Sequence, residues 1–322
     1  MSGARHANFN RALVLSLLMM MMTQVGYLES INPWTNGEET LDEANDVLET
    51  GGSGSSFAYA NDKVAAGNEH TCAILENGDL KCWGLDQVGQ LGDGGTNTNT
   101  NAPASTAIDL GTGRTAVAVS GGVYHTCAIL DNGDLECWGL DQFGQLGDGG
   151  TNTNTNAPSS TAIDLGTGRT AVAVSGGEDH TCAILDNGDL KCWGYDAYGQ
   201  LGDGGTNTNQ GSPVAVSGSN TWDSSTGLSS GSGSGSSSSS SFAYANNKVA
   251  TGIYHTCAIL DNGDVKCWGR DQYGQMGDGG TNTDTNTPSS TAIDLGTGRT
   301  AVAVSAGGYH TCAILDLSLI HI

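Results

Sequence analysis

Short runs in which apolar residues alternate with small ones recur along the chain, separated by stretches rich in glycine, asparagine and threonine. In one stretch, 116–120 (AVAVS) alternates valine with small residues, and 124–130 and 135–138 are two further apolar runs. Runs of this length predict β-strands rather than helices. We expect these segments to be strands, with 107–110 (AIDL) as a fourth, and the GQLGDGGTNTNTN stretch to be a loop.

The same pattern is written several times. A phrase that begins HTCAIL starts at five positions, which are spaced by 55, 55, 75 and 55 residues: His70, His125, His180, His255 and His310. The longest spacing contains a tract of serine and glycine at 229–241. One unit of this size cannot bury enough apolar surface to fold alone, so the units must stack on one another. The expected fold is all-β, a β-propeller of four-stranded blades with four complete units and one incomplete unit.

Each complete unit carries two cysteines on either side of an Asn-Gly turn. With a two-residue turn, Cys72 would pair with Trp83 and the two sulfurs would point to opposite faces. With a three-residue loop, Gly78 takes a left-handed conformation and the register shifts by one, so that Cys72 faces Cys82. A disulfide therefore requires the bulged turn. The expected disulfides are Cys72–Cys82, Cys127–Cys137, Cys182–Cys192 and Cys257–Cys267, each worth about 2–3 kcal/mol.

The fifth unit departs from this pattern. The residues LSLIHI at 317–322 stand where the other units have NGDLKC, so that Ile322 occupies the position of the second cysteine. We therefore expect Cys312 to be unpaired and the last blade to be incomplete.

The phrase H-T-C-A-I-L-x-N-G-D-x-x-C-W-G, followed by GQLGDG, resembles the regulator of chromosome condensation repeat over about residues 57–316. The matching residues of the first unit are His70, Thr71, Asn77, Gly78, Trp83, Gly84, Gly89, Gln90, Leu91 and Gly92. The resemblance implies a seven-bladed β-propeller with four-stranded blades. The family's founding activity is guanine-nucleotide exchange on a small GTPase at chromatin; that role needs a nuclear or cytosolic location, so we do not transfer it and keep it only as an alternative by resemblance. This chain differs in its number of units, its paired cysteines and its serine-rich insertion.

Charge and the N-terminal segment limit the possible partners. The formal net charge is -23, from 34 acidic and 11 basic residues. Such a surface repels nucleic acid and suits a cation or a basic partner. The apolar run at 12–22 follows Arg5 and Arg11, which is typical of a secretory signal and too short for a membrane span. We therefore expect a secreted or cell-surface protein, without nucleic-acid binding or a membrane span after cleavage, in a compartment that permits disulfides.

The expected organisation has six segments. They are a signal peptide (1–26), an acidic and Gly/Ser-rich linker (27–56), propeller repeats one to three (57–217), a Ser/Gly-rich linker (218–241), repeats four and five (242–316) and an off-pattern tail (317–322).

Three motifs allow metal or cofactor chemistry. His70 with Cys72 and Cys82 offers three zinc ligands, but a fourth is missing and a disulfide is favoured; the histidine is then a hydrogen-bonding residue between blades. The DGGTNTN loop at 93–99 resembles a Ca²⁺ loop without its terminal Glu, so calcium stays an alternative to a plain turn. The G-x-G-x-x-A sequence at 111–116 leads into a strand, not a helix, and is interpreted as a turn. No cofactor is expected.

The expected binding surface lies where the copied loops differ. Four positions that correspond to one another carry different side chains, and we interpret them as contact positions: Val88, Phe143, Tyr198 and Tyr273. The tryptophans Trp83, Trp138, Trp193 and Trp268 are expected to pack between blades.

The predicted function is non-catalytic binding of another protein or a cell-surface component, because neither a G-x-S-x-G nor an H-E-x-x-H motif is present. The alternatives are a Ca²⁺-dependent adhesion protein, a propeller hydrolase or lyase, and a guanine-nucleotide exchange factor. Residues 96–127 and 151–182 are nearly identical, which favours domain-swapped dimers.

Overall fold

The computed structural model describes residues 63–150, 153–224 and 246–316. The expected signal peptide, the first linker and the off-pattern tail lie outside the described residues, and so does most of the second linker. No helix in the described ranges is both long and apolar enough to cross a membrane.

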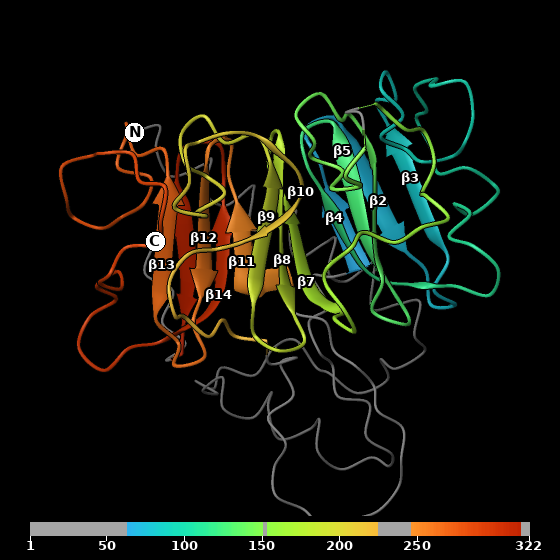
Figure 1. Cartoon of the computed structure of the whole chain (residues 1–322). Coiled ribbons are helices and arrows are strands. Elements are labelled where there is room, and N and C mark those ends of the chain that lie inside the picture. The colour runs from blue at the N-terminus through green and yellow to red at the C-terminus, as the bar shows by residue number, and fades with distance from the viewer. Residues whose placement is uncertain (1–62, 151–152, 225–245, 317–322) are drawn as a thin grey trace, which may run out of the picture. The chain divides into compact units, whose positions relative to one another are not determined.

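The described part is all-β, as expected, with five antiparallel sheets whose strands follow one another in chain order (Figure 1). We call the sheets blades 1 to 5. Blade 1 contains β1 (Val64–Ala66), β2 (His70–Ile74) and β3 (Leu80–Gly84); blade 2 contains β4 (Ala116–Gly121), β5 (His125–Leu130) and β6 (Leu135–Gly139); blade 3 contains β7 (Ala171–Gly176), β8 (His180–Leu185), β9 (Leu190–Gly194) and β10 (Gln210–Ala215); blade 4 contains the 3₁₀ turn η3 (Asn246–Lys248), β11 (Val249–Thr251), β12 (His255–Ile259) and β13 (Val265–Gly269); blade 5 contains β14 (Ala301–Ala306) and β15 (Thr311–Leu315).

The central hairpin of each blade has the register that the bulged turn predicts. In blade 1, Cys72 faces Cys82, and Gly78 has a φ of 84°. The amide of Leu75 donates to the carbonyl of Asp79 at 2.8 Å, which closes a three-residue loop. The same register recurs in blades 2, 3 and 4, and each hairpin carries one disulfide: Cys72–Cys82, Cys127–Cys137, Cys182–Cys192 and Cys257–Cys267. Cys312 is an exposed free thiol.

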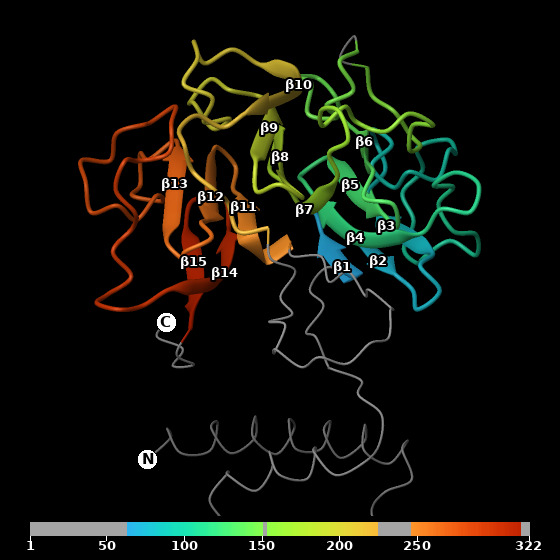
Figure 2. The same ribbon diagram turned by 60° about the horizontal axis from the view of Figure 1, so that its bottom comes forward.

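The expectation of a fourth strand at 107–110 is wrong. This segment forms no strand and is tied to blade 1 by a hydrogen bond from the Ile108 amide to the Leu80 carbonyl (2.9 Å). The outer edge of blade 1 is otherwise met by an isolated bridge between Gly84 and Thr100. Blade 3 alone among the described sheets has a regular fourth strand, β10, because its sequence after the loop is QGSPVA instead of the AIDL phrase. Figure 2 shows β10 at the edge of blade 3 opposite β7.

The apolar core lies between blades rather than inside them. Strand β2 contacts β4, β5 contacts β7, and β12 contacts β14. One buried cluster joins Leu80 and Leu91 of blade 1 to Leu130 and Trp138 of blade 2. The other three clusters join blades 2 and 3, blades 3 and 4, and blades 4 and 5. The tryptophans of blades 2, 3 and 4 are fully buried in these junctions, as expected. Because a buried tryptophan removes a large apolar area from water, each blade is stabilised mainly by its neighbour.

Candidate binding face

A repeated polar network ties each blade to the next. The Nε2 of His70 lies 2.8 Å from Oγ1 of Thr126, and that hydroxyl donates to the carbonyl of Gln90 at 2.8 Å. Because the hydroxyl proton goes to Gln90, the histidine must donate from Nε2 and leave Nδ1 unprotonated. Nδ1 is buried without a partner, in agreement with this tautomer. The indole N–H of Trp138 donates to the same carbonyl at 3.1 Å.

The network recurs at the later junctions. The His–Thr distance is 2.8 Å for His125–Thr181, 3.0 Å for His180–Thr256 and 2.9 Å for His255–Thr311. Burial lowers the pKa of His125 and of His180 to about 3, so both rings are neutral at ordinary pH. The histidine of the repeat is therefore a structural hydrogen-bond donor between blades, as expected.

The invariant glutamines also hold the positions that we interpret as contact positions. The side-chain Oε1 of Gln145 accepts the amide of Phe143 at 2.9 Å, and that of Gln200 accepts the amide of Tyr198 at 3.0 Å. Equivalent bonds hold Val88 and Tyr273. A residue held through its backbone can change its side chain without losing the bond. The frame of each loop is therefore the same in every copy, whereas the side chain that it presents varies.

A buried aspartate completes this frame. Asp141 is fully buried, and its Oδ1 accepts the amide of Leu146 at 3.0 Å. Asp196 does the same for Leu201 at 2.9 Å. Burial raises the pKa of both carboxyl groups to about 6.

Two of the four predicted contact residues meet in one cluster. The ring of Phe143 lies 4.8 Å from that of Tyr195, which lies 6.4 Å from Tyr198 and 6.0 Å from Tyr254. Tyr198 and Tyr254 are 5.0 Å apart. These centroid distances are those of favourable aromatic pairs. We call Phe143, Tyr195, Tyr198 and Tyr254 the aromatic cluster; it draws on blades 2, 3 and 4.

The other two predicted residues lie outside the cluster. Tyr273 is 63% exposed and packs edge-on against Tyr309 of blade 5, at 5.4 Å. Val88 is half-buried in the equivalent loop of blade 1.

Sequence reasoning missed several neighbours of this cluster. Tyr195 and Arg270 follow the Cys-Trp-Gly end of their blades, where the first two copies have leucine. Asp179 and Tyr254 precede the repeated histidine, and Glu178 precedes Asp179. All of these positions vary between copies, so the same comparison of copies that selected Tyr198 would have found them.

Charged groups flank the rings. The guanidinium carbon of Arg270 lies 4.7 Å from the ring centroid of Tyr198 and 5.5 Å from that of Tyr254. Oδ1 of Asp179, which also lies near the rings, accepts a hydrogen bond from the side-chain amide of Gln145 at 3.1 Å. Burial, with the charge of Glu178 second, raises the pKa of Asp179 to about 6. Burial and then Glu178 raise the pKa of Tyr254 to about 12. The cluster is therefore bounded by one cation and two acids.

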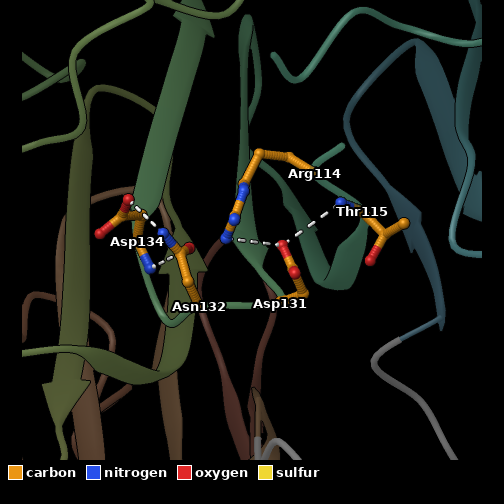
Figure 3. A network of polar contacts seen from close by, with 5 residues as sticks. All are labelled: Arg114, Thr115, Asp131, Asn132 and Asp134. Atoms are coloured by element: carbon orange, nitrogen blue, oxygen red, sulfur yellow. Dashed lines mark hydrogen bonds and ion pairs between the residues drawn. The ribbon is translucent and has the colours of Figure 1, made fainter. Parts of the chain in front are cut away.

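In blades 2 and 3, the opposite ends of the strands carry a network that is the same in both copies (Figure 3). Arg114 pairs with Asp131 at 3.3 Å, and the amide of Thr115 donates to the same carboxylate at 3.4 Å. In the adjoining turn, the Asn132 amide donates to Asp134 at 2.6 Å. The Arg169–Asp186 pair at 3.4 Å and the Asn187–Asp189 bond repeat this arrangement in the next blade. One end of the blades thus holds the chain's own turns, and the other varies.

The motifs with possible metal or nucleotide chemistry serve as local structure here. The eight paired cysteines are in disulfides. Within the described ranges, no group of three or more His, Cys, Asp and Glu side chains is placed to hold a metal ion. In the loop at 93–99, Asp93 accepts the amide of Gly95 at 2.8 Å. Asp109 accepts the amide of Gly111 at 3.0 Å, and β4 follows this turn directly.

The stacked antiparallel blades, joined by one repeated junction, define a β-propeller. Two family models for the regulator of chromosome condensation (RCC1) repeat match this chain. One matches residues 62–90, 116–145, 171–200 and 247–275, and the other matches 77–129, 132–184 and 262–314. The chain belongs to this repeat family.

Relatives and solved structures agree with this assignment. The chain is 32% identical over 216 residues to the ultraviolet-B receptor UVR8 of Arabidopsis thaliana. The aligned stretch covers 67% of this chain and 42% of the receptor. It is also 28% identical over 250 residues to the human E3 ubiquitin-protein ligase HERC2. This aligned stretch covers 78% of this chain and 5% of the ligase. The chain thus spans less than half the length of these relatives.

Among solved structures, Prp20p of Saccharomyces cerevisiae superposes with a TM-score of 0.60 at 21% identity, over 80% of this chain and 57% of Prp20p. Human WBSCR16 superposes with a TM-score of 0.61 at 20% identity, over 79% of this chain and 60% of its own. At these identities the likeness concerns the fold. The work on Prp20p describes its binding to Gsp1p and histones.

Proposed function

We propose that this chain is an exported, non-catalytic binding module that contacts another protein through the aromatic cluster and the charged groups around it. One observation carries the proposal: residues that differ between otherwise copied units gather at one end of blades 2, 3 and 4, and the loops of Phe143 and Tyr198 are held by a glutamine side chain that is the same in every copy. Such a division between a rigid frame and variable contacts suits recognition rather than catalysis.

Two further points support the proposal. Tyrosine, which supplies three of the four rings of this cluster, and arginine, which lies over two of them as Arg270, are enriched in protein interfaces because they combine apolar area with a polar group. Four hairpin disulfides and the apolar run at 12–22 favour an oxidising compartment outside the cell. Guanine-nucleotide exchange is less well supported, since the net charge is -23 and the matched relatives are covered only in part.

The test places a photo-cross-linking amino acid at Tyr198 and, as a control, at the exposed Thr112 on the opposite ends of the strands. Each variant is expressed in cells that export the protein, and the culture is irradiated. We expect a discrete protein adduct from position 198 and none from position 112. Equal labelling from both positions, or none from position 198, would contradict the proposal. The intact mass of the exported chain, before and after reduction, checks the export and the four disulfides in the same samples.

A further inference from the structure

The aromatic cluster is a partly exposed platform made by three successive blades. Its rings are held at centroid distances from 4.8 to 6.4 Å, and all four are only half-buried. Because their backbones are tied to the blade frame, the rings lose little conformational freedom when something binds to them. The platform is therefore prepared for a ligand group that stacks on tyrosine and phenylalanine.

The platform already holds one cation of its own chain. The guanidinium of Arg270 lies over Tyr198 and Tyr254, within the distance at which a ring face attracts a positive charge. This contact shows which chemistry the exposed rings favour. No cation lies over the ring of Tyr195 or Phe143 in the ring contacts of the described residues.

Two acids beside the rings form no ion pair among the described residues. Glu178 and Asp179 are half-buried immediately before β8, next to Tyr195 and Tyr254, and the carboxylate of Glu178 accepts a hydrogen bond from the neutral Tyr254 hydroxyl. The ion pairs found among the described residues are Arg114–Asp131, Arg169–Asp186 and Lys248–Asp223, and none includes either acid. Asp179 receives one neutral amide hydrogen bond, from Gln145. A half-buried carboxylate without a counter-charge is costly, and a cation brought beside it relieves that cost.

We propose that the platform binds a lysine or arginine side chain of a basic segment on the partner, with the cation placed between the Glu178–Asp179 pair and the rings of Tyr195 and Phe143. This inference rests on the proposed function and names the chemistry of its partner. The net charge of -23 favours approach of a basic partner from a distance. The ring faces and the two acids then select a cation over a neutral or acidic group.

The test uses the full chain with its disulfides formed and a short fluorescent peptide of alternating arginine and serine. A peptide of the same length, with citrulline in place of arginine, keeps the shape and removes the charge. Binding is followed by fluorescence anisotropy. We expect saturable binding of the arginine peptide with a Kd below about 1 mM, and citrulline binding weaker by about tenfold or more. Equal binding of both peptides would overturn the proposal and favour a neutral stacking ligand such as a carbohydrate.

Matched variants separate this site from general attraction to an acidic protein. Glu178→Gln with Asp179→Asn removes two charges beside the platform. Glu76→Gln with Asp261→Asn removes two charges from exposed positions at the opposite ends of the strands. We expect the first pair to raise the Kd by about tenfold and the second by less than about twofold. Tyr195→Leu keeps apolar bulk and should also weaken binding. Equal effects of the two charge pairs would overturn the proposal.

Failure of the cationic partner can be distinguished from failure of the proposed binding function. A protein adduct at position 198 without binding of the arginine peptide would refute the cationic partner and leave the binding module standing. Absence of both would refute both.

Discussion

The same hairpin sequence is core in one part of the molecule and surface in another. Trp138, Trp193 and Trp268 are fully buried, whereas Trp83, in an identical Cys-Trp-Gly phrase, is only half-buried. Thr181 and Thr256 are fully buried between blades, and Thr71 is not. The difference is a neighbour: blade 1 has no described blade before it. A residue's contribution to stability is therefore decided at the junction rather than by the sequence of its own blade.

Blade 5 shows the complementary edge. Ile314 is 62% exposed, whereas its counterparts Ile184 and Ile259 are fully buried. His310 is exposed, while the four histidines before it each meet a threonine of the next blade.

The largest effect should come from the tryptophan. Replacement of Trp193 by alanine should lower the free energy of unfolding by about 3–5 kcal/mol, since it removes a fully buried side chain and a hydrogen bond to Gln145. Trp83→Ala should cost less than about half of that, because the ring is already partly in water. Equilibrium denaturation in urea measures both; equal losses would break the comparison between interior and first blades.

Unlike the tryptophans, the disulfides of the first blade and of an interior blade should contribute equally to stability. Cys182→Ser with Cys192→Ser, and Cys72→Ser with Cys82→Ser, each open a loop of the same length. In the chain-entropy account the loss depends on loop length and not on neighbours, so each pair should cost about 2–3 kcal/mol. Denaturation of the two double variants tests this. A difference as large as that between the tryptophans would show that the bonds act through the junction instead.

Loss of the threonine hydroxyl should also lower stability more in an interior blade than in the first blade, but by less than loss of the tryptophan. Thr181→Val leaves the buried N–H of His125 without a partner and removes one of the two hydrogen bonds to the carbonyl of Gln145, the other coming from Trp193, which should cost about 1–3 kcal/mol. Thr71→Val has no such bond to lose and should change stability by less than about 0.5 kcal/mol. Thermal unfolding of both variants is the measurement. If Thr181→Val does not change the stability, the hydrogen bonds from His125 to Thr181 and from Thr181 to Gln145 do not stabilise the junction.

The smallest expected effect is on the pH dependence of the stability, through the histidine that is buried at the junction. The pKa of His180 is about 3 in the folded chain and about 6.5 when unfolded, so the unfolded state binds the extra proton between these values. Stability from this residue is complete above pH 6.5 and is lost as pH falls toward 3. His180→Gln should flatten the decline by about 1 kcal/mol between pH 6.5 and 5.5, measured against the parent. An unchanged slope would contradict a buried neutral ring.

The carboxyl groups act in the opposite direction over part of this range. Burial raises their pKa, to about 7 for Glu136 and about 6 for the three aspartates, so the folded state binds more protons and gains stability as pH falls through these values. These groups are Glu136, Asp141, Asp179 and Asp196. Only the difference between His180→Gln and the parent isolates the histidine.

Local chemistry made the hairpins predictable. The Asn-Gly turn and the spacing of Cys72 and Cys82 fix the register, because only a left-handed Gly78 brings the two sulfurs to one face. The outer strand was not predictable in this way, since the AIDL phrase has strand composition but makes a backbone bond only at Ile108 to the adjacent strand.

The candidate binding face was predictable only in part. Comparison of the copies identified Phe143 and Tyr198 as variable. It could not show that Tyr195 lies between them, or that Tyr254 arrives from the next blade, because these meetings depend on how neighbouring blades pack. Variation between copies indicates which residues can differ; packing decides which of them meet.

The repeated junction has a consequence for assembly. Its His, Thr, Gln and Trp contacts are the same at the junctions of blades 2 and 3 and of blades 3 and 4, so this shared set does not by itself distinguish one blade boundary from the other. The order of the blades is then specified by the covalent tethers between them. Exchange of equivalent blades between two copies of the chain would keep every junction contact, so the protein concentration during refolding should decide between monomers and domain-swapped dimers.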